Sequence, residues 1–245
     1  PATMAAVIAH PEWPRADLSS LRLLNSGSMV VPETLIQAFH SRGIPVGQIY
    51  GATETAPIAT ALRAEDAMRK AGSAGKAVPH CDVTLVEGEI WARGPALMRG
   101  YWNAGKVSGL TDEGWFRSGD LGRLDEEGFL WVVGRSKDVI ISGGENIYPA
   151  EIENLLASHP LVAECAVLGQ PDAQWGEIVV AVVVLRQPAS ADGNDALADW
   201  EPTLREFLRS RIARYKQPRR WRALPALPKT ALGKVQKQQL ASQLL

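Results

Sequence analysis

The sequence predicts an α/β unit followed by a smaller α+β unit, and three patterns support this prediction. Upstream of Gly134, short apolar segments that end in glycine flank a helical pattern. Downstream, strand, helix, strand, strand and helix patterns follow one another. A charged stretch at 135–138 separates the two parts, so we expect one unit over residues 1–136 and a second over residues 137–245.

The first unit contains a strand–helix–strand pattern. "SSLRLLNSG" and "VGQIYG" predict strands, and "VPETLIQAFHSRG" between them predicts a helix with Pro32 near its start and Gly43 after its end. "VTLVEGEIWARG" predicts two strands around Glu87 and Gly88, and "GFLWVVG" predicts another strand. For the second unit we expect strands at 139–142, 165–168 and 178–185, a helix from Pro149, a polar loop near 190–195 and a helix over 202–213.

Composition excludes several classes of protein. Lys+Arg total 26 against 27 Asp+Glu, and this balance argues against a dedicated nucleic-acid or membrane-surface protein. The longest apolar run, 178–185, is too short to span a bilayer. Cys81 and Cys165 lack metal-ligand spacing and favour a reducing compartment, so we expect a cytoplasmic protein.

Two loops of the first unit invite a phosphate interpretation. In "YGATETAPIAT", Thr53 and Glu54 follow a predicted strand, where a hydroxyl and a carboxylate could hold a phosphate and its Mg²⁺; an ordinary polar turn is the alternative. "GSAGKAV" resembles a P-loop but fails the pattern, since Lys70 and Ala77 stand where glycine and Ser or Thr are needed. We therefore expect a surface turn there.

Other candidates lie around the predicted boundary. Asp120 stands between glycines and could accept hydrogen bonds from a ribose diol, with an ordinary turn as the alternative, while Arg135 lies at a strand end. Gly143 and Gly144 permit backbone dihedrals or a close approach that side chains forbid, which would fit a narrow channel, and Pro149 then suits a first helical turn. A β-to-α turn would also require such a glycine.

The stretch 209–222, "RSRIARYKQPRRWR", holds seven basic residues and no acidic ones. Tyr215 and Trp221 within it could stack on a base while the cations hold phosphates, which favours a small anionic ligand; a solvated helix face is the alternative. Lys234 follows in "PKTALGKVQK", in a glycine-led loop.

Six motifs, in order, carry a resemblance that covers essentially the whole chain. "IYGATE", "GYWN…GWFRSGDLGRLDEEGFLWVVGRSKD", "ISGGENIYPAEIE", "AVLGQPDAQWGE", "ARYKQP" and "PKTALGKVQK" together resemble the AMP-forming acyl-CoA synthetases. These enzymes belong to the adenylate-forming superfamily, which includes firefly luciferase and peptide-synthetase adenylation domains. The resemblance implies an acid–thiol ligase that uses ATP, Mg²⁺ and CoA. A carboxylate attacks the α-phosphate of ATP to give acyl-AMP and pyrophosphate, and the thiol of CoA then displaces AMP.

The resemblance also implies roles for individual residues. Lys234, Thr53 and Glu54 would be catalytic: Lys234 bridges the carboxylate and the α-phosphate, Thr53 contacts phosphate and Glu54 holds Mg²⁺. Lys137 would be the hinge about which the small domain turns between the two half-reactions. The residues that would bind ATP or AMP are Ser26, Gly27, Ser28, Tyr50, Gly51, Asp120 and Arg135, and those that would meet CoA are Gly143, Gly144, Glu145, Trp175, Tyr215, Lys216 and Arg219.

The chain also departs from the family pattern. No "TSGTTGxPK"-like phosphate loop is present, and Ser118 replaces a usual Thr in "RSGD". We therefore expect residues 1–136 to be the carboxyl-terminal part of the large domain, residues 137–245 to be the small mobile domain, and the chain alone to lack full adenylation activity.

The substrate and the wider role stay open at this point. Small or apolar residues at 55–58 favour a fatty acid, and aromatic or short acids are not excluded. Two alternatives to a ligase are an adenylation domain that loads a carrier protein and a non-catalytic remnant that binds a nucleotide or a partner. No nucleic-acid partner or transmembrane segment is expected, and a homodimer is an open alternative.

Overall fold

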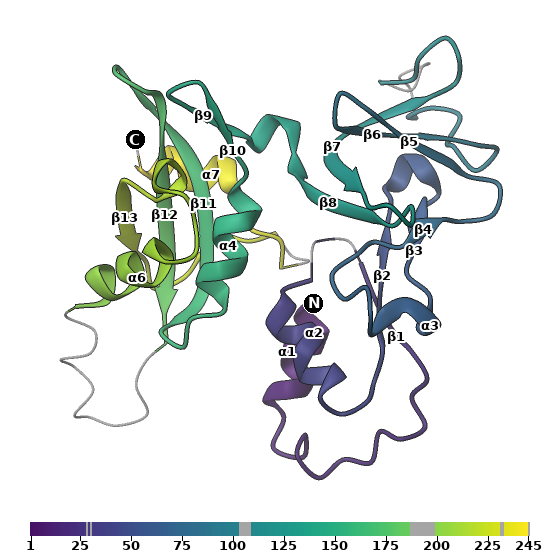
Figure 1. The fold of residues 1–245 in the computed structure, drawn as a ribbon, viewed down its shortest axis with the longest axis horizontal. Coiled ribbons are helices and arrows are strands. Elements are labelled where there is room, and N and C mark those ends of the chain that lie inside the picture. Colours follow the sequence, from purple (N-terminus) through teal and green to yellow (C-terminus); the bar gives the residue numbers. More distant parts are fainter. Residues whose placement is uncertain (28, 30, 103–108, 187–198, 231–232, 245) are drawn as a thin grey trace. The chain divides into compact units, whose positions relative to one another are not determined.

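The computed structural model describes residues 1–27, 29, 31–102, 109–186, 199–230 and 233–244. Ser28 and the polar loop expected near 190–195 lie outside this part of the chain. The chain divides into two compact units, Pro1–Ser136 and Lys137–Leu245 (Figure 1). The mixed α/β architecture agrees with the expected fold class.

The first unit begins with a small mixed sheet covered by helices. Strands β1 (Leu24–Ser26) and β2 (Val46–Tyr50) are parallel, and β3 (Thr60–Ala61) and β4 (Lys76–Ala77) extend the sheet. Helices α1 (Ala2–Ala9) and α2 (Glu33–His40) bury Met4, Ile36 and Phe39 with strand residue Val46. The strand–helix–strand prediction is confirmed, because Pro32 precedes α2 and Gly43 follows it with φ 71°.

An antiparallel sheet follows, in the order β5 (Asp82–Val86), β6 (Glu89–Arg93), β7 (Phe116–Leu124) and β8 (Leu130–Arg135). Glu87 and Gly88 join the first two strands with φ of 49° and 82°, as a two-residue hairpin turn requires. A short helix, α3 (Ala64–Ala67), lies between β3 and β4.

The surface turn predicted for "GSAGKAV" is wrong. Ser73 is fully buried, and its hydroxyl donates to the carbonyl of Leu130 at 2.8 Å. Gly75 pairs with Leu130 as well, and a Cβ on Gly75 would lie 1.9 Å from the Ala61 carbonyl oxygen. The glycine is therefore needed because two strands meet closely, so this segment joins the two sheets of the unit.

The second unit has a five-stranded sheet. Strands β10 (Glu145–Ile147), β9 (Ile140–Ser142), β12 (Gly176–Leu185) and β11 (Val162–Asp172) lie in that order, and β13 (Arg220–Ala223) pairs in parallel with β12. The strands predicted at 165–168 and 178–185 are present and longer than expected, because they form one continuous hairpin through Asp172 and Gly176.

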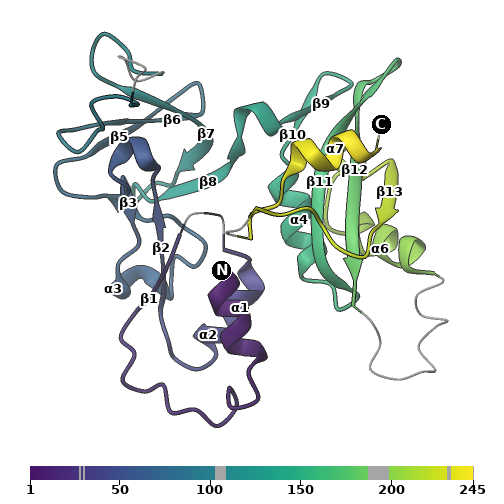
Figure 2. The ribbon, with the colours of Figure 1, turned by 180° about the vertical axis from the view of Figure 1, so that it is seen from behind.

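Helices cover both faces of this sheet. On one face, α4 (Pro149–Ala157) and α6 (Trp200–Arg209) bury Ile152, Leu156, Leu204 and Leu208 against it. On the other, α7 (Lys237–Leu244) buries Leu240, and Figure 2 shows this helix in front of the strands. The alternation of side chains along β12 supplies both faces, which is why this strand is apolar from Ile178 to Leu185.

The helix predicted over 202–213 is shorter than expected. It ends at Arg209, because the amides of Arg211 and Ile212 close the last turn on the Leu208 carbonyl and Ala213 is extended. A 3₁₀ turn at Arg214–Lys216 follows.

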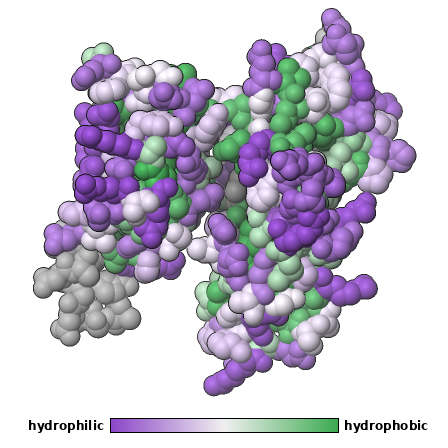
Figure 3. Space-filling view, viewed as in Figure 1, coloured by the Kyte–Doolittle hydropathy of each residue, from purple (hydrophilic) through white to green (hydrophobic). Residues whose placement is uncertain are grey.

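Hydrophilic and hydrophobic residues are interspersed over the visible face of each unit (Figure 3). Within the described ranges, no helix is long and apolar enough to cross a membrane.

Candidate functional site

Three of the predicted nucleotide-binding residues meet in the first unit. Tyr50 at the end of β2 donates its phenol hydrogen to Asp120 Oδ2 at 2.9 Å, and Arg135 Nε lies 3.0 Å from Asp120 Oδ1. Asp120 and Arg135 are cross-strand partners on β7 and β8. The carboxylate is therefore held from two sides, and its side chain is only 15% exposed.

The backbone around Asp120 is fixed by its neighbours. Gly119 has φ 72°, and its amide donates to Glu89 Oε1 at 2.9 Å. The Ser118 hydroxyl donates to the Ile90 carbonyl at 2.6 Å and accepts from the Asp120 amide at 3.0 Å. Burial, and then the charge of Asp120, raise the pKa of Tyr50, so the phenol stays protonated and remains a donor.

The "NSG" segment lies at the end of β1. Ser26 is buried, and a Cβ on Gly27 would lie 2.6 Å from Ile49 Cγ1 on β2. Gly51 is equally restricted, since a Cβ there would lie 2.0 Å from the Pro57 carbonyl oxygen. Both glycines are required by close packing, Gly27 against the Ile49 side chain and Gly51 against the Pro57 backbone. Ser28, predicted with them, lies outside the described residues.

Thr53 and Glu54 form the 3₁₀ turn η1 (Thr53–Thr55) directly after β2. Thr53 is exposed and Glu54 is half-buried. The Glu54 carboxylate accepts a hydrogen bond from the Tyr101 hydroxyl, and its carbonyl accepts one from the Met98 amide at 2.9 Å. The sequence interpretation missed Tyr101, although it stands in the quoted "GYWN" motif.

The predicted metal ligand has no companion carboxylates. Among the described residues, no group of three or more His, Cys, Asp or Glu side chains could hold a metal ion. A single carboxylate is nevertheless an ordinary protein contribution to Mg²⁺, which takes its other ligands from water and substrate phosphates.

In the second unit, Gly143 and Gly144 form the turn of the β9–β10 hairpin. Their φ values are 61° and 86°, which is the backbone of a two-residue hairpin turn. The segment is therefore a β-hairpin that precedes α4, and the alternative of a direct β-to-α turn is wrong. Gly143 donates its amide to the Trp175 carbonyl at 2.8 Å, and a Cβ on Gly143 would lie 2.9 Å from the indole.

Arg219 completes this group. Its guanidinium lies 4.1 Å from the centroid of the Trp175 ring, so the turn, the indole and a cation are brought together. Glu145 is exposed on the adjoining strand β10.

Tyr215 and Lys216 lie on the 3₁₀ turn η4 (Arg214–Lys216). Tyr215 is exposed. Lys216 donates to both carboxylate oxygens of Glu151, at 2.8 and 2.7 Å. This hydrogen bonding is the largest cause of the raised pKa of Lys216. The sequence interpretation missed Glu151 as its partner. A phosphate that binds Lys216 must compete with this carboxylate.

Trp221 is not available to stack on a base, so that prediction is wrong. It is 4% exposed, its indole donates to the Pro218 carbonyl at 3.2 Å, and its ring packs edge-on against Trp200. Because β13 alternates, Trp221 enters the core while Arg220 and Arg222 are exposed.

The two predicted lysines outside these groups are exposed. Lys137 is the first residue of the second compact unit, in a 3₁₀ turn at Ser136–Asp138. Lys234 lies between Gly233 and α7, and its ammonium forms no ion pair with any carboxylate in the part of the chain that the structure describes.

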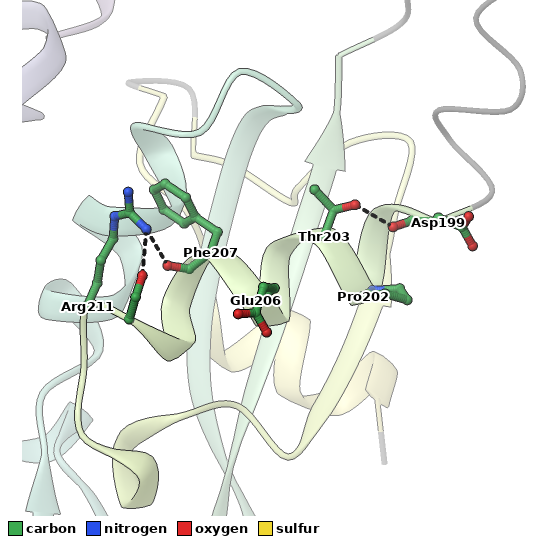
Figure 4. A pocket seen from close by; sticks show the side chains of 7 residues that line it. Asp199, Pro202, Thr203, Glu206, Phe207 and Arg211 are labelled. Atoms are coloured by element: carbon green, nitrogen blue, oxygen red, sulfur yellow. Dashed lines mark hydrogen bonds between the residues drawn. The ribbon is translucent and has the colours of Figure 1, made fainter.

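A shallow hollow lies along α6, and it contains none of the predicted site residues. Phe207 and Arg211 line one end, where Arg211 donates to the Phe207 carbonyl and to the Ser210 hydroxyl (Figure 4). Asp199, Pro202 and Thr203 line the other end.

Two family models match the chain. The model described as AMP-binding enzyme matches residues 1–102, and the AMP-binding enzyme C-terminal domain matches residues 151–234.

Relatives match almost the whole chain. An indoleacetate–CoA ligase of Aromatoleum aromaticum is 51% identical over 97% of this chain and 47% of its own length. A long-chain-fatty-acid–CoA ligase of Mycobacterium tuberculosis is 39% identical over 99% of this chain and 49% of its own length. The solved O-succinylbenzoate coenzyme A synthetase of Bacillus subtilis, in complex with ATP and magnesium ion, matches 98% of this chain and 50% of its own length, with 37% identity and a TM-score of 0.80. The chain thus spans about half the length of the curated relatives it matches.

Proposed function

Because the chain belongs to the AMP-binding enzyme family and corresponds to the carboxyl-terminal half of its members, we propose that it forms part of an AMP-forming acid–thiol ligase. The ligase activates a carboxylic acid with ATP and transfers the acyl group to CoA. The observation that supports this most directly is the Tyr50–Asp120–Arg135 cluster, which presents a fixed carboxylate at the position assigned to the ribose.

The cluster fits a ribose diol. Asp120 Oδ2 accepts a hydrogen bond from Tyr50, and Asp120 Oδ1 forms an ion pair with Arg135. A carboxylate offers about four lone-pair sites, so each oxygen keeps one free. Both oxygens can therefore accept from a ribose hydroxyl without losing their protein partners. Tyr50 would then lie against the base, and the glycine backbone of Gly27 and Gly51 would border the nucleotide.

Glu54 fits a Mg²⁺ ion bound mainly by ATP. When bound, the ion would neutralise charge on the departing pyrophosphate. Thr53, exposed beside Glu54, would donate its hydroxyl to a phosphate oxygen.

Lys234 would act on the first half-reaction. A carboxylate oxygen forms a bond to the α-phosphorus while the bond to the pyrophosphate oxygen breaks, and negative charge develops around phosphorus. A fixed ammonium next to that charge stabilises the transition state, and electrostatic preorganisation of this kind is usually the largest catalytic contribution.

The second half-reaction would use the β9–β10 hairpin. The sulfur of CoA attacks the acyl carbon, AMP leaves and the thiol proton is released. Rotation at Lys137 would exchange Lys234 for this hairpin in one active site. Gly143 and Gly144 would border the pantetheine arm, while Glu145, Trp175, Arg219, Tyr215 and Lys216 would meet the rest of CoA, with Glu151 displaced from Lys216.

Two acid classes have support. The small or apolar residues at 55–58 favour a fatty acid, and the long-chain relative is consistent with it. The higher identity to an indoleacetate ligase favours an aromatic acid. The Thr55 hydroxyl exchanges hydrogen bonds with Ala52, so this side chain holds the turn in addition to any contact with the acid.

The test is a panel of acids assayed with ATP and CoA, using the chain extended to the length of its relatives. The proposal predicts AMP and a thioester in equal amounts, with the best acid in the aromatic or the fatty class. Transfer to a carrier protein but not to CoA would support an adenylation domain. Failure of every acid to release pyrophosphate, with retained AMP binding, would support a non-catalytic role.

A further inference from the structure

Strand β11 forms an edge of the second unit's sheet, because β12 is its one strand partner among the described residues. The outward backbone groups of an edge strand need other partners. At Val167 two side chains provide them: Glu153 Oε1 accepts from the amide at 2.8 Å, and Lys237 Nζ donates to the carbonyl at 3.0 Å.

These two side chains also bind each other. Lys237 Nζ lies 2.7 Å from Glu153 Oε1, and the side chains are 27% and 24% exposed. The carboxylate, the ammonium and the backbone of one residue of β11, Val167, thus form a closed ring that joins α4, β11 and the first residue of α7.

Lys229, Lys234 and Lys237 lie close together in the sequence, and we call the stretch from 229 to 237 the lysine segment. Because Lys237 is three residues after Lys234, the ring anchors the carboxyl-terminal end of this segment. At the other end, Lys229 Nζ pairs with Glu164 Oε1 at 2.7 Å. Between the anchors, the Thr230 amide donates to the Lys234 carbonyl at 2.8 Å, and the Lys234 amide donates to the Thr230 side-chain hydroxyl at 3.2 Å.

The three lysines of this segment therefore differ in kind. Lys229 and Lys237 are neutralised by carboxylates of β11 and α4, while Lys234 is exposed without such a partner among the described residues. An ammonium without an ion-pair partner among the described residues, between two anchored lysines, is the arrangement that presents one cation at a fixed place.

We propose that Glu153, acting through Lys237, is a positioning residue for Lys234 in the adenylation half-reaction. This inference rests on the proposed role of Lys234. Glu153 touches no substrate; its carboxylate fixes the start of α7 and thereby the reach of Lys234. Misplacement of a catalytic group by about 1 Å can cost about 100-fold in rate.

The test compares the two half-reactions in a version of the chain extended to the length of its relatives. Glu153→Gln removes the charge but keeps an amide oxygen that can accept from Val167. We expect acid-dependent pyrophosphate exchange to fall by about 10- to 100-fold. Conversion of supplied acyl-AMP to thioester should stay at the parental rate, because Lys234 takes no part in it.

Three further variants make the result interpretable. Lys237→Met should lower pyrophosphate exchange as Glu153→Gln does, whereas Lys237→Arg, which keeps the positive charge, should retain most of it. These two variants keep the test decisive if Glu153→Gln does not fold. Glu206→Gln removes the carboxylate of an exposed pair with Arg209, far from the lysine segment in sequence, and should change neither half-reaction. Amide exchange over residues 233–237 should be faster in Glu153→Gln than in Glu206→Gln.

Lys234→Ala separates failure of this inference from failure of the proposed function. If Lys234→Ala keeps exchange, the proposed role of Lys234 is wrong. If Lys234→Ala loses exchange but Glu153→Gln retains it, or loses both half-reactions equally, the positioning inference is overturned.

Discussion

The Asp120 side chain links the two sheets of the first unit through its polar contacts. Its partner Tyr50 comes from the first sheet and Arg135 from the second. The carboxylate is thus aligned before any nucleotide binds, so less conformational freedom remains to be lost on binding.

Replacement of Tyr50 by Phe tests this alignment. The variant loses the 2.9 Å hydrogen bond but keeps the ring. A hydrogen bond to a charged group contributes about 1.5 kcal/mol or more, so we expect AMP affinity to weaken about tenfold. Titration calorimetry with AMP measures it, with Tyr148→Phe in the second unit as the control. Equal affinity in the two variants would show that the phenol does not position Asp120.

Individual residues were predictable where a motif specifies chemistry and not where only tertiary contacts reveal it. Asp120 and Arg135 were expected together, and their cross-strand pairing places them so. Trp221 was misassigned because the basic run drew attention to charge, whereas the alternation in "RWR" indicates one buried side chain between two exposed ones. Tyr101 and Glu151 contact partners 47 and 65 residues away, a separation that no local pattern reports.

At the scale of elements, the two glycines of the β9–β10 turn are constrained differently, one by its backbone dihedral alone and the other also by side-chain packing. Both have positive φ, but only Gly143 packs against an indole, 2.9 Å from a built Cβ. Alanine in the left-handed region costs about 1–2 kcal/mol.

We expect Gly144→Ala to lower the free energy of unfolding of the second unit by about that amount, and Gly143→Ala to lower it further because Trp175 must also move. Urea unfolding followed by tryptophan fluorescence measures both variants. Identical losses would mean that the contact with the indole has no energetic weight.

Two histidines accept backbone hydrogen bonds near the ends of helices, and only a neutral imidazole ring can accept such a bond. His40 Nε2 at the end of α2 accepts from the Val46 amide at 3.2 Å, and His159 Nδ1 after α4 accepts from the Leu161 amide at 3.2 Å. Burial lowers the pKa of His40. Burial also lowers the pKa of His159, and the nearby positive charge of Arg211 lowers it further. Their stabilisation is therefore complete above the unfolded pKa of about 6.5 and is lost as the pH falls below it.

His40→Gln should accordingly melt at a lower temperature than the parent at pH 7.5, and the difference between them should shrink towards pH 5. Thermal unfolding at several pH values measures this difference. The substitution His80→Asn, at an exposed histidine, is the control. A His40→Gln difference that grows towards acid pH would contradict the assignment.

Helices and strands with a clear apolar pattern were predictable, but α1, β7, β13 and α7 were not among the expected elements, and the ends of elements were less predictable. Pro32 and Gly43 bracket α2 as expected. The end of α6 at Arg209 was missed because no glycine or proline marks it, and the amides of Arg211 and Ile212 turn back on Leu208 instead. The strand expected at 139–142 is present as β9, but the hairpin was missed because β10 has only three residues and the glycine pair was attributed to a close approach or to a β-to-α turn.

At the scale of the whole molecule, the candidate residues are divided between two units. Tyr50, Glu54 and Asp120 belong to the first, and Lys234 and the Gly143 turn belong to the second. The boundary at Ser136 and Lys137 lies within the charged stretch that the sequence marks. No residue pattern within one unit encodes where that unit lies relative to the other.

The most direct test of the central claim is the effect of Lys234→Ala on each half-reaction, measured in the chain extended to the length of its relatives. The account predicts that acid-dependent pyrophosphate exchange falls by about 100-fold or more, as for loss of one preorganised electrostatic donor. Supplied acyl-AMP should still be converted to the CoA thioester at the parental rate. Equal loss of both reactions, or retention of exchange, would contradict the account.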